Sequence, residues 1–195
     1  MLIGVFSLLS GWLCEVNEIC RKMSNLAVGY LTLKHMKKQS RTIEWSVLNQ
    51  DELSSNDLML VNAAKEATAG SWSPYSGFKV GAALLLDDGT VVTGSNQENA
   101  AYPSGLCAER TALFAAGHAH PGKAVTALAI AARNDKGFTA QPITPCGACR
   151  QVLAETEQRG GSPIRYILYG TEGIMLIEGG TDSILPFCFG ADSMK

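Results

Sequence analysis

The sequence has little net charge and no segment long and apolar enough to be an obvious membrane anchor. A formal charge of −2 over 195 residues gives no basic surface of the kind that a nucleic-acid backbone attracts. Residues 3–13 are largely apolar, but this run is well short of the ~20 residues that span a bilayer. No Lys or Arg precedes it, as one would in a secretory signal. We therefore expect a cytoplasmic protein that binds neither membrane nor nucleic acid.

Residues 1–35 do not share the pattern of the rest. We interpret residues 1–49 as an N-terminal extension that is either disordered or the result of a start codon placed before a natural start at Met36. In that interpretation Cys14 and Cys20 have no function. Residues 50–195 contain no internal repeat, low-complexity run or linker, and their length suits one domain with a hydrophobic core.

Helical and strand patterns alternate along residues 50–195. Apolar residues at helical spacing, N-cap candidates and glycine stops predict helices, and short apolar runs bounded by turn residues predict strands. The expected helices cover residues 58–68, 108–119 and 146–158, and the expected strands cover residues 78–86, 90–93, 125–132, 164–168 and 174–177. This alternation predicts a layered α/β sheet.

Six cysteines are present, but their spacing does not make the framework of a small secreted protein. Cys146 and Cys149 stand three apart, so on a helix both side chains face the same way, about 5–6 Å apart at Cβ. Cys107 supplies a third thiolate, and catalytic zinc usually takes three protein ligands. Glu109 lies two residues from Cys107 and can reach a water molecule without binding the metal. The pattern predicts a catalytic zinc site.

Two other interpretations of these cysteines were weighed. A thioredoxin-type dithiol accounts for Cys146 and Cys149 but leaves Cys107 and its neighbour Glu109 unexplained. Structural zinc takes four protein ligands, and the nearest histidines, His118 and His120, lie about 15 Å from Cys107 along a helix over residues 108–119. Helix starts beside the cysteines would lower the thiol pKa and favour metal binding.

At these motifs the chain resembles the cytidine deaminases, specifically the small class with three cysteine ligands. The likeness rests on Cys107-Ala-Glu-Arg, on Pro145-Cys-Gly-Ala-Cys-Arg-Gln, and on residues 74–83 and 96–103. It runs from about residue 57 to residue 189. The resemblance implies a three-layer α/β fold with a five-stranded mixed sheet and helices on both faces. It also implies one Zn²⁺ per subunit and hydrolytic deamination of cytidine and deoxycytidine to uridine and deoxyuridine plus ammonia, in pyrimidine salvage.

The resemblance also implies roles for individual residues. Glu109 would carry every proton of the reaction. Arg110 would offset the thiolate charge by bonding the sulfurs, with Gln151 helping to hold it. The C-terminal segment would bring Phe189 onto a neighbouring subunit's site, in a homotetramer with shared active sites. Arg150 is interpreted as a surface or interface arginine. The expected substrate-binding residues, through backbone or side chain, are Phe78, Asn96, Glu98, Ala100, Tyr102, Ala108, Thr144 and Phe189.

Among these, Asn96 and Glu98 would bind the ribose hydroxyls, and Phe78 would cover the pyrimidine. Other functions compatible with the zinc motif are deamination of a related aminonucleoside or of a cytosine in a polynucleotide, and a non-catalytic zinc-binding module that keeps the fold. The intact Glu109 and the sugar motif formed by Asn96 and Glu98 argue against these alternatives.

Overall fold

The structure, a computed structural model, describes residues 37–195, of which Ile43–Lys195 form one compact unit. The predictions for residues 1–36, including the early start and the two cysteines there, lie outside the described residues. Among residues 37–195, no helix combines the length and the hydrophobicity that crossing a membrane requires.

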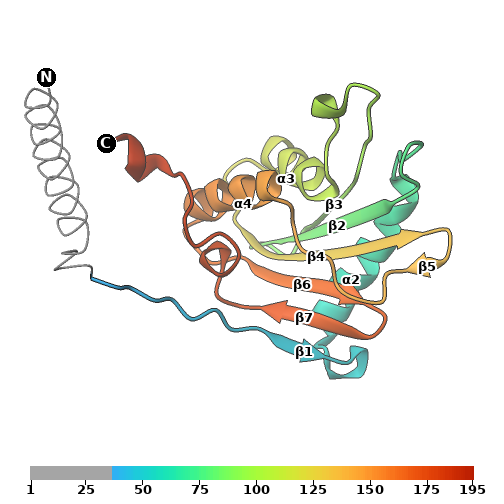
Figure 1. Ribbon diagram of the computed structural model, residues 1–195, viewed down its shortest axis with the longest axis horizontal. Helices are drawn as coiled ribbons and strands as arrows, with labels where there is room; N and C mark the ends of the chain where they lie inside the picture. The colour runs from blue at the N-terminus through green and yellow to red at the C-terminus, as the bar shows by residue number, and fades with distance from the viewer. Residues whose placement is uncertain (1–36) are drawn as a thin grey trace, which may run out of the picture. The chain divides into compact units, whose positions relative to one another are not determined.

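A single mixed sheet forms the centre of this unit (Figure 1). It has seven strands in the order β1-β7-β6-β4-β2-β3, with β5 paired to β4. The β4–β6 pair is parallel, and the other pairs of the sheet are antiparallel. The strands are β1 (Ser46–Leu48), β2 (Lys79–Leu86), β3 (Val91–Ser95), β4 (Val125–Asn134), β5 (Gly137–Phe138), β6 (Arg165–Gly170) and β7 (Gly173–Ile177).

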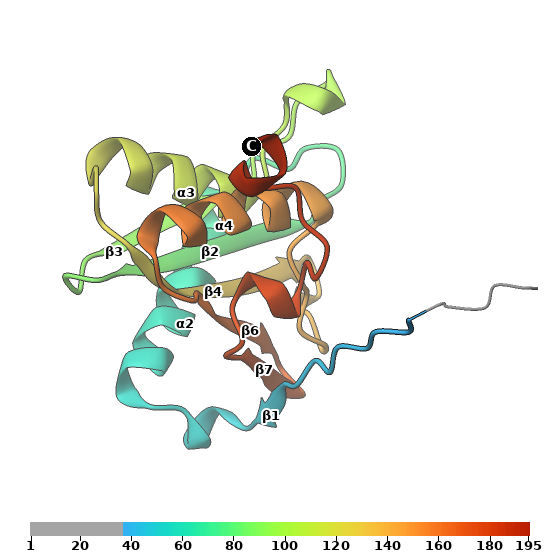
Figure 2. The same cartoon turned by 90° about the vertical axis from the view of Figure 1, so that its left-hand side faces the viewer.

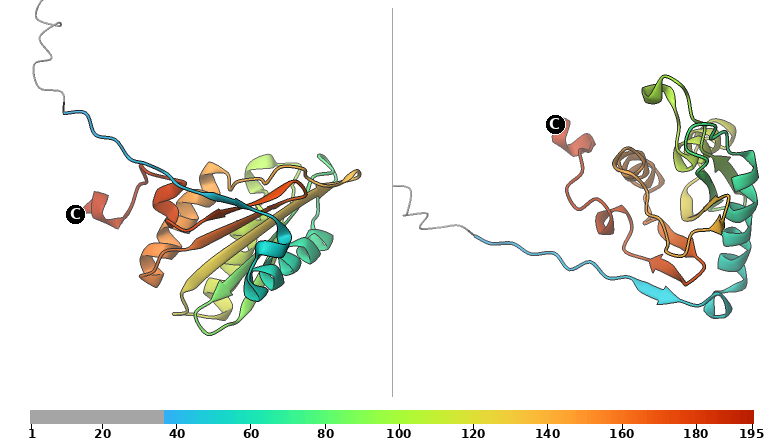
Figure 3. Two further views of the ribbon diagram at one scale, coloured as in Figure 1. Left: turned by 90° about the horizontal axis from the view of Figure 1, so that it is seen from below. Right: turned by 45° about the vertical axis from the view of Figure 1, so that its right-hand side comes forward.

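Helices cover both faces of the sheet, so the unit has three layers (Figures 2 and 3). Helix α2 (Ser55–Ala67) packs on one face, while α3 (Ala108–Ala119) and α4 (Gly147–Gly160) pack on the other. Short 3-10 helices lie in the connections: η1 (Gln50–Glu52), η2 (Thr68–Gly70), η3 (Tyr102–Ser104), η4 (Thr181–Ser183) and η5 (Ala191–Met194).

Alternating side chains of the central strands supply two separate cores. In β4, Leu128 and Ile130 point to the α3 and α4 side, whereas Ala127, Ala129 and Ala131 point to α2. Because successive residues of a strand face opposite sides, a strand covered on both faces has an unbroken apolar sequence. That is the origin of the continuous apolar run in residues 125–132.

The expected fold class is confirmed, with two strands more than the five that the resemblance implies. The additional strands are β1, which pairs with β7, and β5, which pairs with β4. They are three and two residues long, too short to carry a pattern of their own. Strand β1 falls within residues 1–49, so its pairing joins the end of the proposed extension to the sheet.

Close packing of α3 against the sheet depends on Gly94 in β3. A Cβ at this position would lie 2.4 Å from the amide nitrogen of Ala112 and 2.6 Å from the carbonyl oxygen of Ala108. Real atoms do not approach so closely, so only glycine lets the strand backbone touch the first turns of α3. The start of α3, which carries Cys107 and Glu109, is thereby set directly over the sheet.

Candidate active site

Two helices begin at cysteines. Cys107 is the N-cap residue of α3, Cys146 is the N-cap residue of α4, and Cys149 lies in the first turn of α4. Neither N-cap side chain accepts a hydrogen bond from its helix. The first amide groups of both helices therefore remain available, and two positive helix ends meet at one place. The predicted positions of the cysteines at helix starts are confirmed.

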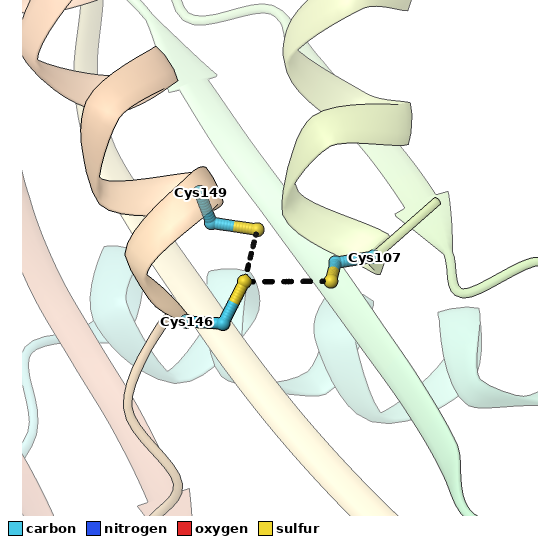
Figure 4. Close-up of side chains that lie close together, drawn as sticks. All are labelled: Cys107, Cys146 and Cys149. Atoms are coloured by element: carbon cyan, nitrogen blue, oxygen red, sulfur yellow. Dashed lines mark hydrogen bonds between the residues drawn. The ribbon is translucent and has the colours of Figure 1, made fainter. Parts of the chain in front are cut away.

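The three sulfurs form a compact cluster (Figure 4). Cys146 Sγ lies 3.7 Å from Cys107 Sγ and 3.5 Å from Cys149 Sγ, and all three atoms lie within 4.8 Å of one another. Two sulfurs bound to tetrahedral zinc at about 2.3 Å are about 3.8 Å apart. The cluster therefore has the size and the ligand type of a zinc site, and it leaves a fourth position for a non-protein ligand.

The cluster favours the thiolate form that a metal needs. Hydrogen bonding with Cys149 and with Arg110 lowers the pKa of the Cys107 thiol to about 5. The same pairing with Cys107 raises the pKa of Cys149, which is fully buried. Because metal ligands must be deprotonated, the lowered pKa of Cys107 favours metal binding at this cluster.

Arg110 reaches this cluster from the first turn of α3. Its Nη2 atom donates to Cys107 Sγ at 3.9 Å, while its buried Nε has no hydrogen-bond partner within residues 37–195. Three thiolates around Zn²⁺ would carry a net charge of −1, and a guanidinium beside them offsets it. The donor set and its neighbouring cation therefore fit zinc.

Glu109 is buried beside the sulfurs, with 5% of its surface exposed. Burial raises the pKa of this carboxyl group, and the negative charge on Cys107 raises it further. A carboxyl group with a raised pKa can exchange protons near neutral pH more readily than an exposed glutamate. Its position next to a metal-binding cluster is the arrangement that general acid–base chemistry requires.

A cavity of about 410 Å³ opens in front of the cluster, within the range of sites that hold small molecules. It brings together most of the residues singled out in the sequence: Phe78, Asn96, Glu98, Tyr102, Cys107, Ala108, Glu109, Arg110, Thr144 and Cys146. Cys149 is buried and is not among the lining residues. The cavity lining includes neither Ala100 nor Phe189.

The Asn96 side chain extends the pairing of β2 and β3. Its oxygen accepts from the amide of Val80 at 2.8 Å and from Ser71 Oγ at 2.6 Å, while its nitrogen donates to the carbonyl oxygen of Phe78 at 2.9 Å. Both lone pairs of the oxygen are used, and one N–H remains. Asn96 can therefore offer a donor, but not an acceptor, to a molecule in the cavity.

Glu98 is held by a residue that the sequence reasoning missed. Ser76 Oγ donates to one carboxylate oxygen, and the amides of Tyr75 and Ser76 donate to the other at 2.9 and 3.2 Å. The hydrogen bond from Ser76, followed by that from Tyr75, lowers the pKa of Glu98. Ser76 also accepts from the amide of Phe78 at 3.0 Å, so its hydroxyl connects two cavity residues. Ser76 lies among the Ser, Pro and Gly residues of positions 70–77, a composition that is typical of a loop and gives no sign of a partner at Glu98.

The C-terminal segment lies away from the cavity of its own chain. Phe189 is 61% exposed and lines a second cavity, of about 480 Å³, beside α4. Gln151 Nε2 donates to the carbonyl oxygen of Phe189 at 2.6 Å. No hydrogen bond between Gln151 and Arg110 is found in residues 37–195, so the support of Arg110 by Gln151 stays a prediction.

Fold and site together define a zinc-binding α/β domain in which two helix starts bring three cysteine sulfurs together, and two of these cysteines and one buried carboxyl group line a cavity. Residues 54–160 match the family described as the cytidine and deoxycytidylate deaminase zinc-binding region. This match covers more than half of the chain, and the chain belongs to that family.

Named relatives agree with this assignment. A cytidine deaminase of Mycobacterium tuberculosis is 46% identical over 142 residues, which are 70% of this chain and 91% of the relative. A cytidine deaminase of Halalkalibacterium halodurans is 50% identical over 97 residues, 50% of this chain and 69% of the relative. The crystal structure of cytidine deaminase from Burkholderia pseudomallei has a TM-score of 0.57 at 41% identity, covering 67% of this chain and 97% of that one.

Proposed function

We propose that this protein is a zinc-dependent hydrolase that deaminates cytidine and deoxycytidine to uridine and deoxyuridine with release of ammonia. We place it in the cytoplasm, in pyrimidine salvage. The observation that carries the proposal is the buried Glu109 carboxyl group facing the same cavity as Cys107 and Cys146. Family membership and relatives named cytidine deaminase support the same reaction.

Cys107, Cys146 and Cys149 would hold the metal. Zinc bound there supplies Lewis acidity that lowers the pKa of water to about 7. The protein's own contribution is proton transfer, because hydrolytic deamination requires protons at N3 of the pyrimidine and on the departing amine. Glu109 takes a proton from the attacking water and returns it to the base, and its raised pKa suits both directions.

The remaining cavity residues would bind the nucleoside. The half-buried Phe78 covers the pyrimidine face, and backbone groups of Ala108 and Thr144 hold the polar edge of the base. The free N–H of Asn96 and the carboxylate of Glu98 offer one donor and one acceptor to the sugar hydroxyls. Among the cavity-lining residues within the described part of the chain, the only cation is Arg110, which lies at the sulfurs. A 5′-phosphate would therefore find no free cation in this lining to balance its charge.

An ultraviolet assay on cytidine, deoxycytidine, free cytosine and cytidine monophosphate tests this assignment, with zinc analysis of the same sample. We expect turnover of both nucleosides, slower reaction of the monophosphate and little reaction of the free base. A zinc-loaded protein inactive on all four compounds would favour the non-catalytic module. Activity on another aminonucleoside alone would favour the related deaminase.

Replacing Ser76 by alanine tests the sugar end of the cavity. The carboxylate of Glu98 loses the hydrogen bond that contributes most to its lowered pKa. That pKa then rises toward its ordinary value, so the acidic limb of kcat/KM moves to higher pH. We expect roughly a two- to fivefold rise in KM for cytidine, since exposed interactions of this kind contribute little.

The control for this variant is Ser55→Ala, because the Ser55 hydroxyl makes no hydrogen bond within the described chain and lies on α2. Zinc content should stay constant in both variants. An unchanged pH profile in Ser76→Ala would separate Ser76 from Glu98 and refute the expectation.

We propose further that the protein is a homotetramer in which Phe189 contributes to a neighbouring subunit's site. Phe189 and Phe187 are 61% and 95% exposed in the single chain, as residues covered by a partner would be. Phe189→Ala should retain zinc but bind nucleoside more weakly, because an aromatic ring stacked on a base contributes about 1–3 kcal/mol. Phe114 is also exposed, on α3, and Phe114→Ala serves as a control for general effects on assembly.

Mixing variants tests the sharing of sites. After subunit exchange, a mixture of Phe189→Ala and Glu109→Gln contains sites in which an intact Glu109 meets an intact Phe189. Activity should exceed the sum of the two separate variants. A mixture that gains nothing, although size and exchange are verified by light scattering and mass spectrometry, would leave Phe189 without a role across subunits.

A further inference from the structure

From the first turn of α4, Arg150 joins the loop that precedes this helix to a distant residue near the C-terminus. Its Nε donates to the carbonyl oxygen of Pro145 at 2.7 Å, and its Nη2 donates to Thr144 Oγ1 at 3.0 Å. Its Nη1 donates to the carbonyl oxygen of Ile184 at 2.7 Å. Each nitrogen of the half-buried guanidinium thus has a separate oxygen acceptor.

Two of the acceptors belong to the loop that lines the cavity directly before α4. Thr144 and Cys146 both line the cavity, and Pro145 between them is buried. The guanidinium is planar and presents its N–H groups in a fixed fork, so acceptors bonded to it are held in fixed relation to one another. Arg150 therefore fixes the segment that passes from the base-binding Thr144 to the metal-binding Cys146.

Arg150 and Arg110 do different things, although each adjoins a residue of the metal site in sequence. Arg110 donates to a sulfur, whereas the hydrogen bonds of Arg150 go to oxygens of the chain. The interpretation of Arg150 as a surface or interface arginine does not account for three such bonds. An arginine that served only as a surface charge would not need an acceptor for each nitrogen of its guanidinium group.

The third acceptor connects this segment to the C-terminus. Ile184 is buried and is the C-cap residue of η4. Gln151, the residue after Arg150 in α4, donates to the carbonyl oxygen of Phe189. Two consecutive residues of α4 therefore bind the C-terminal segment at two points. The Arg150 side chain therefore helps to position both this segment and Thr144.

We propose that Arg150 is a positioning residue, which holds Thr144–Cys146 in the geometry that the substrate base requires and joins this loop to the C-terminal segment. The inference rests on the proposed deaminase function. Arg150 does not touch the substrate or the metal in this role. It acts through the hydroxyl of Thr144 and the two backbone oxygens.

Arg150→Lys tests the proposal, because lysine keeps the charge and the aliphatic stem but cannot fill three acceptors at once. We expect full zinc content, an almost unchanged melting temperature and kcat/KM for cytidine about ten- to a hundredfold lower. Most of the loss should lie in KM, since Glu109 and the sulfurs stay in place. Arg159→Lys is the matched control: Arg159 lies on the same helix and makes no hydrogen bond or ion pair in the described chain.

A double-mutant cycle with Thr144→Val measures the coupling between the two side chains. A purely structural role of Arg150 predicts no such coupling in the kinetics. If Arg150 acts through the Thr144 hydroxyl, the effect of Thr144→Val should nearly vanish in the Arg150→Lys background. Cytidine affinity, measured by calorimetry in a Glu109→Gln background, should show the same pattern without relying on turnover.

The outcomes separate this proposal from the proposed function. A zinc-loaded parent protein that does not deaminate cytidine would overturn the function. An active parent with an unaffected Arg150→Lys variant, or with strictly additive effects of the two substitutions, would overturn the positioning role. Loss of zinc or early melting in Arg150→Lys would overturn it too, because Arg150 would then support the metal site or the fold rather than the base.

Discussion

Glu109→Gln should yield a folded, zinc-loaded protein that binds cytidine and hardly deaminates it. Glutamine has nearly the same size, so the packing of this 5%-exposed side chain survives. The amide cannot accept a proton from water and return it to the pyrimidine. Losing a general acid–base group costs about 10²–10⁴-fold, and a group that serves several transfers should reach or exceed the upper value.

Stopped assays at high enzyme concentration measure this residual rate, and calorimetry with cytidine measures binding. The matched control is Glu66→Gln, an exposed glutamate on α2, which should behave like the parent. A Glu109→Gln protein without zinc would assign Glu109 to the architecture of the site. Near-normal turnover would remove it from the reaction.

Cys107→Ser should lose both zinc and activity. Serine is a good N-cap residue, so the start of α3 is preserved while one of three sulfur ligands is removed. Substitutions that only support a metal ligand weaken binding by about 10–100-fold, and removal of a ligand itself should exceed this. After dialysis against a chelator, metal analysis should find far less zinc than in the parent.

Cys188→Ser is the control for this variant, because Cys188 is exposed and lies outside the sulfur cluster. It should keep one zinc per subunit and full activity. Retention of stoichiometric zinc and normal turnover by Cys107→Ser would contradict the assignment of Cys107 as a ligand.

The sequence predicted those parts of the site whose residues lie close together along the chain. Cys107 and Glu109 are two residues apart, and Cys146 and Cys149 are three apart, so their placement at helix starts follows from local rules. Gly161, with φ of 68°, ends α4 and is one of the glycine stops expected from the sequence. The three-layer arrangement follows from apolar runs that are buried on both sides.

What the sequence did not predict depends on contacts between distant loops. Ser76 reaches Glu98 across 22 residues, and Arg150 reaches Ile184 across 34. The local sequence around a turn serine or a helix arginine does not predict which distant residue it will bond. Strand β1 is likewise specified by its pairing with β7 and not by its three residues.

The cysteines at the N-caps also affect the backbone of the helices they begin. Helix starts usually gain about 0.5–2 kcal/mol from a capping side chain, and neither Cys107 nor Cys146 supplies such a bond. When the sulfurs bind an ion, the first turns of α3 and α4, which lack side-chain caps, are both attached to it. Local folding of α3 and α4 is therefore thermodynamically linked to occupancy by zinc. The same ion therefore affects both catalysis and backbone order. Zinc depletion should abolish deamination and also increase the mobility of the loop that carries Thr144.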